Sequence, residues 1–398
     1  MTSWTQTTFA PPIPAARKWL DGVDFPADRP LIDLSQAVPA DPPPQVLQDV
    51  MAEALKSPAT HLYGPVLGLS SLRETLAATW SGFYDAKVAP NQIAITAGCN
   101  QAFAACIAAL CSAGDEVILP VPWYFNHKMC MDMTGVVARP IAVGAGLLPD
   151  VDQARSLITP NTKAILLISP NNPTGVEYPP ALLHGFFDLA REHGLKLIID
   201  ETYRDFHSQA DPVHALLKTT DWDHTLIQLY SFSKSFRMTG HRTGAIIANA
   251  ETLSEVEKYL DTITICAPTL GQIAAEWGLR NLGPWLADQR ADLLTRRAAV
   301  EDSFPVLADK GWQLHGVGAY FAWVTHPFAG RAQDLAPKLV REAGVLLLPA
   351  SMFMPEGDTS ADRAFRIAFA NVTPSDIKKV TQRLASLDWP LAGARPAS

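Results

Sequence analysis

Short apolar segments alternate with helical stretches between about residues 70 and 281, and this alternation limits the folds available to the chain. Parallel strands need long crossover connections, which are usually helices. The alternation therefore predicts an α/β fold with a mostly parallel, doubly wound sheet. The expected strands cover residues 93–97, 116–120, 138–143, 163–169, 195–200, 225–231 and 243–248, and the expected helices include 100–111, 179–193 and 251–260.

The pattern changes near Gly283-Pro284. A long helical stretch follows at about 285–304, and it could connect two domains. Short strands and helices come after it, which is typical of a smaller α+β domain. The expected parts are an N-terminal segment (1–55) that contributes to the small domain, a large domain (56–284) and a C-terminal small domain (285–398); the expected later elements are strands at 319–324 and 365–370 and helices at 331–342 and 374–387.

Charge and composition exclude several classes of partner. The 398 residues include 32 lysines and arginines against 40 acidic residues, a net charge of −8 with no basic block, so we expect neither nucleic acid nor an anionic membrane as a partner. No apolar run approaches the roughly 18 residues of a membrane span. Residues 1–20 lack the apolar core of a signal peptide, and the five cysteines have no CxxC spacing. We therefore expect a cytoplasmic protein with reduced thiols and no metal site.

The segment Ser231-Phe232-Ser233-Lys234 follows an apolar run, and Arg242 lies eight residues after the lysine. A lysine is costly to bury unless it is neutralised or hydrogen-bonded. A lysine at a strand end, with hydroxyls before it and an arginine after it, suits an amine that forms an imine beside a phosphate. That combination indicates a site for pyridoxal phosphate (PLP).

Three other segments place polar groups just after expected strands. Asn172-Pro173-Thr174-Gly175 follows one strand, Asp200-Glu201-Thr202-Tyr203 follows another, and Gly98-Cys99-Asn100 leads from a third into a helix. Ligands bind at the carboxyl ends of the strands in open α/β sheets. We therefore expect these segments to form one site.

Together these segments resemble the fold-type I PLP enzymes, in particular the class I and II aminotransferases. The resemblance runs from about Ile32 to the end of the C-terminal domain, and it includes Arg366. It implies the PLP-dependent transferase fold type I. It also implies an aminotransferase that moves an amino group from an L-amino acid to a 2-oxo acid, by a ping-pong mechanism through an internal aldimine at Lys234.

The resemblance gives a role to each residue around the cofactor ring. Lys234 forms the resting imine and then moves the proton, while Asp200 faces the pyridine nitrogen. Tyr124 stacks on the ring, with Trp123 as the second choice, and His127 supports the aspartate. The remaining cofactor contacts fall on Asn172 and Tyr203 at the ring hydroxylate and on Gly98, Cys99, Asn100, Ser231 and Arg242 at the phosphate.

The substrate side of the site is implied less completely. The family uses the position of Arg366 for the substrate α-carboxylate, and Asn172 lies beside that group. Ala37 stands where the family often has glycine, so this wall of the pocket is expected to be tighter. No arginine lies near Thr262, where aspartate-specific members carry one from the partner subunit, so a dicarboxylate bound in that way is disfavoured. Trp19, Trp123 and Tyr320 could favour an apolar or aromatic substrate, although such residues are more often core.

Tyr63, in His61-Leu62-Tyr63-Gly64-Pro65, resembles the segment that reaches the phosphate in the neighbouring subunit. The resemblance therefore implies a homodimer with shared active sites. A helix-start loop with a packed tyrosine is the alternative interpretation of the same segment.

Three other functions remain open from the sequence. A lyase that carries out C–S cleavage or β-elimination, or a decarboxylase, would use the same fold, cofactor and first step. A non-catalytic ligand sensor is a more distant alternative, because only about 30 residues precede the family region and no basic helix is evident. The motifs do not identify the amino donor, the acceptor or the pathway.

Overall fold

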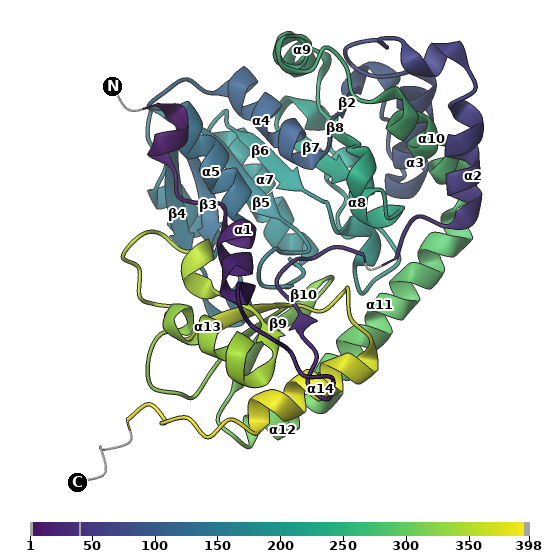
Figure 1. Ribbon diagram of the computed structural model, residues 1–398. Coiled ribbons are helices and arrows are strands. Elements are labelled where there is room, and N and C mark those ends of the chain that lie inside the picture. The colour runs from purple at the N-terminus through teal and green to yellow at the C-terminus, as the bar shows by residue number, and fades with distance from the viewer. Residues whose placement is uncertain (1–2, 40, 394–398) are drawn as a thin grey trace.

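The computed structural model describes residues 3–39 and 41–393. Its centre is a seven-stranded sheet in which β8 runs antiparallel to both of its neighbours and all other pairs are parallel. The expected mostly parallel sheet is therefore confirmed (Figure 1). From one edge to the other, its strands are β2 (Ile93–Thr96), β8 (Gly244–Ile247), β7 (Leu226–Ser231), β6 (Lys196–Asp200), β5 (Thr162–Ile168), β3 (Glu116–Val121) and β4 (Val137–Ala142).

Helices cover both faces of this sheet, as the doubly wound prediction requires. Successive residues of β5 point into two different cores: Ile165 and Leu167 into one, Ala164 and Leu166 into the other. Burial on both faces explains why the strands are continuous apolar runs rather than alternating ones. The first core contains α3 (Ser70–Tyr84), α6 (Val151–Ser156), α7 (Pro180–Glu192) and α10 (Thr269–Asn281), and the second contains α4 (Cys99–Leu110), α5 (Phe125–Thr134) and α9 (Ala250–Ile263).

Local sequence signals fix where several helices begin and end. The side chain of Asn249 caps α9 by accepting a hydrogen bond from the amide of Thr252 at 2.8 Å. Pro180 occupies the first turn of α7, where a missing amide hydrogen costs nothing. Gly135 takes a left-handed conformation with φ of 74° at the end of α5.

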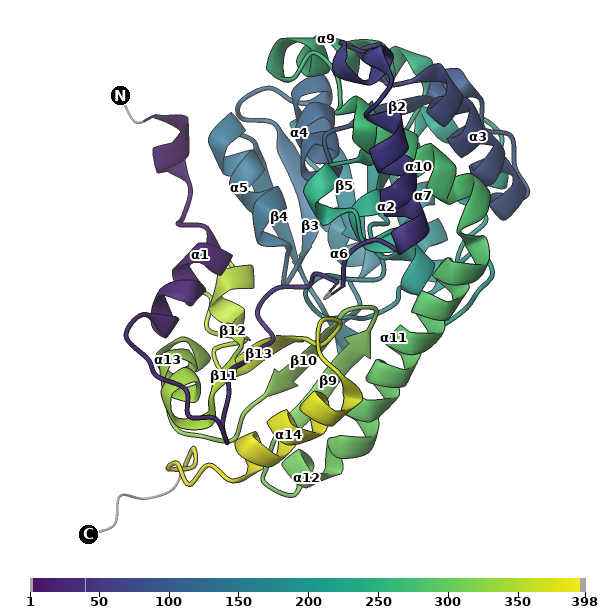
Figure 2. The ribbon, with the colours of Figure 1, turned by 45° about the vertical axis from the view of Figure 1, so that its right-hand side comes forward.

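A second layer lies below the large sheet, and a long helix joins the two (Figures 1 and 2). It contains an antiparallel four-stranded sheet of order β12-β13-β10-β9 and a short parallel pair, β1 with β11. The elements are β1 (Ile32–Asp33), β9 (Gln313–Gly318), β10 (Phe321–Thr325), β11 (Val345–Leu346), β12 (Leu348–Pro349), β13 (Ala364–Ala368), the joining helix α11 (Gly283–Ser303), α12 (Pro305–Ala308), α13 (Ala332–Ala343) and α14 (Pro374–Ala385).

The N-terminal segment divides between the two layers. It contains α1 (Pro12–Arg17), then β1, which pairs with β11 of the second layer, and then α2 (Gln45–Ala54), which packs against α10 beside the large sheet. The first residues of the segment also contact the large sheet, because the hydroxyl of Thr7 donates to the carbonyl oxygen of Asp132 in α5, so only the stretch around α1 and β1 lies with the second layer. The division into domains at residues 55 and 284 stays a prediction.

Two properties of the described residues concern membrane spans and metal sites. Within residues 3–39 and 41–393, none of the helices combines the length and apolar character that a membrane crossing requires. Nor does that part of the chain bring together three or more His, Cys, Asp or Glu side chains as a set of metal ligands.

Gly244 of β8 packs tightly against the start of α4. A Cβ atom on Gly244 would lie 2.7 Å from both the amide nitrogen of Cys99 and the carbonyl carbon of Gly98, and neither backbone atom can rotate away. Gly244→Ala should therefore displace the start of α4 and lower the free energy of unfolding by about 1–3 kcal/mol. Urea unfolding, compared with the wild type, measures this change.

Gly82→Ala is the matched control. A Cβ atom on Gly82 would meet no atom within 4 Å, and Gly82 lies inside α3. Alanine there should leave stability unchanged or raise it by up to about 1 kcal/mol. Equal unfolding midpoints for the two variants would contradict the packing argument.

Candidate active site

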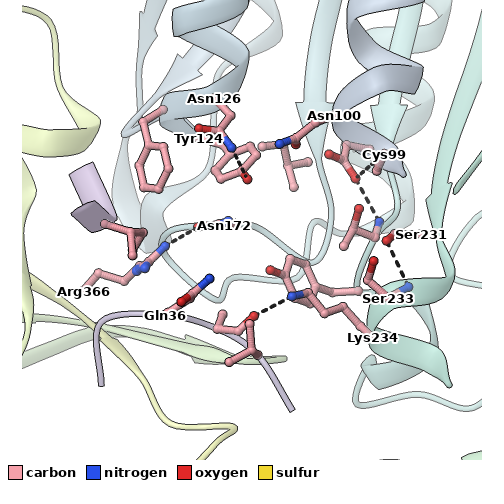
Figure 3. Close-up of a pocket in the computed structure, with 18 of the residues that line it drawn as sticks. Gln36, Cys99, Asn100, Tyr124, Asn126, Asn172, Ser231, Ser233, Lys234 and Arg366 are labelled. Atoms are coloured by element: carbon pink, nitrogen blue, oxygen red, sulfur yellow. Dashed lines mark hydrogen bonds between the residues drawn. The ribbon is translucent and has the colours of Figure 1, made fainter. Parts of the chain in front are cut away.

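A single pocket at the carboxyl edge of the large sheet collects most of the residues singled out from the sequence (Figure 3). Segments that follow β2, β3, β5, β6 and β7 all reach it, because these strands point in the same direction. The predicted residues that line it are Ala37, Cys99, Asn100, Tyr124, Asn172, Asp200, Tyr203, Ser231, Lys234, Arg242 and Arg366.

Lys234 projects into this pocket from α8 (Phe232–Ser235), a single helical turn that directly follows β7. The hydroxyl of Ser231 caps the turn by accepting from the amide of Ser233 at 3.3 Å. The Nζ atom of Lys234 donates to the carbonyl oxygen of Ala37 at 2.5 Å. Burial, together with the positive charges of Arg242 and Arg366, lowers the pKa of Lys234 to about 8. A substantial fraction of this amine is therefore neutral, and nucleophilic, near physiological pH.

Asp200 ends β6 and is only 5% exposed. Burial alone would raise its pKa, but His127 and Thr202 outweigh burial and lower it. The Nε2 atom of His127 lies 3.3 Å from Oδ2, and the amide of Thr202 donates to Oδ1 at 2.9 Å. Asp200 is therefore a fixed negative charge at the wall of the pocket.

The thiol of Cys99 also contacts this carboxylate. Its Sγ atom lies 3.7 Å from Oδ1 of Asp200. Burial and the negative charge of Asp200 raise the pKa of the thiol well above its ordinary value, so Cys99 stays protonated. The sequence had suggested a role only for its backbone amide.

Arg366 enters the pocket from β13 and is 2% exposed. Its Nη1 atom donates to Oδ1 of Asn172 at 3.0 Å, and Nη2 donates to the carbonyl oxygen of Ser35. No carboxylate of the described residues lies within ion-pair distance of the guanidinium. Burial accordingly lowers the pKa of Arg366 to about 10. A buried cation with only neutral partners is suited to bind an anionic ligand.

A second group of residues suited to bind an anion lies at the other end of the pocket. The amides of Cys99 and Asn100 open α4, and the first amides of a helix have no partner within it. Arg242 donates to the Oγ atom of Ser233 at 3.4 Å and to the carbonyl oxygen of Thr239 at 3.0 Å. A Cβ atom on Gly98 would lie 2.1 Å from Nη2 of Arg242, so the guanidinium can reach the helix start only because residue 98 is glycine.

Two tyrosines complete the walls. The hydroxyl of Tyr124 accepts from Nδ2 of Asn126 at 2.9 Å, and burial raises the pKa of Tyr124 to about 12. Tyr203 is buried against Tyr320, with ring centroids 5.1 Å apart, and burial raises its pKa well above the ordinary value. Trp123 does not line the pocket: it packs in the core behind it. Tyr124 is therefore the aromatic ring that faces the cavity.

The structure corrects the expectation about the other large aromatic residues. Trp19, Trp123 and Tyr320 do not line the pocket, because all three pack into hydrophobic cores. Sequence reasoning gave no role to several residues that do line the pocket. Ile13 belongs to α1, which lies far from the motifs in the chain, while most of the others are neighbours of motif residues. These additional lining residues are Ile13, Gln36, Val38, Phe125, Asn126, Ile168, Thr202 and Ser233.

Tyr63 does not approach the pocket of its own chain. Its side chain is 79% exposed, and the adjacent Leu62 is 68% exposed. The segment does lead into a helix, α3, but Tyr63 does not pack within its own chain, so the alternative of a packed tyrosine is wrong in that respect.

Comparisons with known proteins agree with this geometry. A model of the family described as aminotransferase class I and II matches residues 29–384. An aromatic aminotransferase of Arabidopsis thaliana is 31% identical over 371 residues, which cover 89% of this chain and 88% of that protein. An aspartate aminotransferase of Pyrococcus abyssi is 29% identical, and the match covers 79% of this chain and 82% of that protein. The solved structure of Thermus thermophilus aspartate aminotransferase with maleate superposes with a TM-score of 0.86 at 26% identity. The match covers 96% of this chain and 98% of that chain.

These matches span nearly the whole chain, and they are aminotransferases rather than lyases, decarboxylases or sensors. The chain therefore belongs to the class I and II aminotransferase family, and it is a PLP-dependent enzyme that transfers amino groups between amino acids and 2-oxo acids.

Proposed function

We propose that this aminotransferase binds its L-amino acid between Arg366 and Lys234. The observation that carries the proposal is a buried guanidinium without a carboxylate partner that shares one cavity with an amine of lowered pKa. An α-amino acid has a carboxylate and an amino group on the same carbon. It can therefore satisfy the arginine while it presents its nitrogen near the lysine.

The described residues fit PLP. The helix start of α4 and Arg242 suit its phosphate, and the anionic Asp200 suits a protonated pyridine nitrogen. When bound, the cofactor supplies an aldehyde that captures the amino group and a ring that accepts the electron pair left when the Cα proton departs. The protein supplies binding, orientation and proton transfer.

We assign two chemical tasks to Lys234. With PLP bound, Lys234 would hold the cofactor through its neutral Nζ atom, a task to which a pKa of about 8 is suited. As a free amine beside the substrate, the same Nζ atom would accept the proton that leaves Cα. The carbonyl oxygen of Ala37 orients the amine, since it accepts a hydrogen bond from Nζ.

The remaining lining residues hold the ring and the phosphate. Asp200, which lies beside His127, would keep a proton on the ring nitrogen, and Tyr124 would pack over the ring face. Asn172 and Tyr203 would hold the ring oxygen. The phosphate ligands are the amides of Cys99 and Asn100, the hydroxyls of Ser231 and Ser233, and the guanidinium of Arg242, with Gly98 leaving room for them.

The first prediction concerns the pH at which Lys234 becomes reactive in the protein without cofactor. Because its pKa is lowered, the neutral amine forms as pH rises through about 8 rather than 10.5. Modification of Lys234 by an amine-reactive reagent, followed by peptide mass spectrometry, should show its midpoint there. Arg242→Gln removes one of the positive charges that lower the pKa, so its midpoint should move upward.

Arg237→Gln is the control for this experiment. Arg237 lies in the same segment, but its charge is paired with Asp41 at 3.0 Å. Its loss should move the midpoint much less than the loss of Arg242. A wild-type midpoint near 10.5 would contradict the assignment of Lys234 as the reactive amine.

A second prediction tests carboxylate binding. Arg366→Leu should lower kcat/KM for amino acids by about a hundredfold or more, because a buried charge-assisted contact is lost. The absorption spectrum of the bound cofactor should stay unchanged, because Arg366 lies at the substrate end of the pocket. Arg366→Lys keeps the charge but not the two-pronged geometry, and it should recover only part of the activity.

The same idea can be checked with the wild type alone. L-Methionine should convert the cofactor to its amino form far faster than 3-(methylthio)propylamine, which lacks the carboxylate. Equal rates for the two compounds would show that Arg366 does not bind the substrate carboxylate.

We also propose a homodimer in which Tyr63 of one subunit completes the phosphate site of the other. The support is the 79% exposure of Tyr63, next to exposed Leu62, in a segment that does not serve its own pocket. Large exposed apolar groups of this kind are typical of interfaces.

Five free cysteines further support a reducing, cytoplasmic location.

Mixing two inactive variants tests the shared site. Tyr63→Asp and Lys234→Ala each damage every site in their own homodimers. In a mixed dimer, one site would carry both lesions and the other neither, so subunit exchange should restore part of the activity. A monomer in sedimentation, or no recovery after verified exchange, would leave Tyr63 as a surface residue.

A further inference from the structure

Gln36 occupies the one stretch of backbone that touches both reactive ends of the pocket. The carbonyl oxygen of Ser35 accepts from Arg366, and that of Ala37 accepts from Lys234 at 2.5 Å. The side chain of Gln36 therefore starts between the carboxylate-binding guanidinium and the amine, and Figure 3 shows it projecting into that space. A substrate held by Arg366 and Lys234 must extend its side chain past this residue.

Arg17, at the end of α1, fixes how the glutamine is turned. Its Nη2 atom donates to Oε1 of Gln36 at 3.1 Å. The carbonyl end of the amide is thereby engaged, and the Nε2 end is left as a donor. Among residues 3–39 and 41–393, Nε2 has no hydrogen-bond partner.

No charged residue that lines the pocket is left to pair with a charged substrate side chain. The ionised groups are Asp200, Lys234, Arg242 and Arg366, and each has a task at the cofactor or the carboxylate. The other lining groups near Gln36 are apolar or neutral, among them Ile13, Val38, Phe125 and Asn126. Arg17 lies just outside the lining, but its Nη2 atom already donates to Gln36, so a charged side chain would lose its hydration here without gaining a free counter-charge.

We infer that Gln36, held by Arg17, is a specificity-determining residue, and that the site selects neutral amino acids whose side chain accepts a hydrogen bond. The inference rests on the proposed binding of the amino acid between Arg366 and Lys234. Its substrates are unbranched and amide-bearing, with L-glutamine as the probe. Apolar chains of the same length fit the cavity but leave Nε2 of Gln36 unpaired.

The wild-type holoenzyme is tested first. Half-reactions with L-glutamine, L-methionine, L-glutamate and L-lysine are followed by loss of the PLP absorption band. L-Glutamine should give the highest kcat/KM, L-methionine a lower value, and both charged amino acids values lower by about tenfold or more. If none of the four reacts, the inference fails; if no L-amino acid reacts, the proposed function fails as well. If L-glutamate is preferred, only the inference about neutral side chains fails.

Gln36→Leu removes the donor and keeps the size of the side chain. It should lower the ratio of kcat/KM for L-glutamine over L-methionine by about tenfold, the effect of one ordinary hydrogen bond. A purely structural role would lower both values together and leave the ratio unchanged, and so would a contact to the shared α-carboxylate. Either of those results overturns the inference. Gln36→Met repeats the test with a flexible side chain.

Arg17→Ala tests how the glutamine is held. It should lower the same ratio by about threefold, because the amide stays but is free to turn. In the Gln36→Leu background it should have no further effect, which is the mark of two residues acting as one unit. Lys18→Ala is the control, because Lys18 is the next residue along, is exposed and does not line the pocket.

A different result for Arg17 would also decide the matter. If Arg17→Ala lowers kcat/KM for L-glutamate and leaves that for L-glutamine unchanged, the arginine binds a side-chain carboxylate directly. If the effects of Arg17→Ala and Gln36→Leu simply add, the two residues act separately. Both outcomes overturn the proposed pairing.

Discussion

The shared direction of the strands in the large sheet is the constraint on which the site depends. β2, β3, β5, β6 and β7 end at the same edge, so residues more than a hundred positions apart meet in one cavity. β8 runs the other way, and its Gly244 presses against the start of α4. The parallel strands thus bring the groups together, while the antiparallel one fixes the helix whose amides face the pocket.

The pocket carries more positive than negative charge, and this imbalance explains its chemistry. Lys234, Arg242 and Arg366 face a single carboxylate, that of Asp200. Burial lowers the pKa of Lys234 most, and the nearby cations Arg242 and Arg366 lower it further, to about 8. Anions bound at the two ends, a phosphate and a substrate carboxylate, would balance the arginines. The same binding groups therefore also tune the reactive amine.

The sequence predicted the large sheet closely because all of its strands except the edge strand β4 are buried on both faces and read as apolar runs bounded by turns. The sequence also predicted many of the residues that line the pocket, because the motif residues directly follow those apolar runs. It missed β1, β9, β11 and β12, which are short or partly exposed and lack a clear period. Ile13 was missed because only tertiary packing brings α1 to the pocket, and the resemblance indicated Ala37 but gave no role to its neighbour Gln36.

The rear of the pocket is held by buried polar pairs that leave little freedom there. Glu201, the residue after the pocket aspartate, lies with Oε1 2.6 Å from Nε2 of His214. Ser235, the residue after the pocket lysine, donates to Oδ2 of Asp205 at 2.7 Å, and Tyr230 donates to the same oxygen at 2.6 Å. Breaking such buried pairs is costly, so the positions of the reacting groups are fixed. Substitutions that change substrate choice therefore disturb the fold least at the opposite wall, where half-exposed side chains from the N-terminal segment face the cavity.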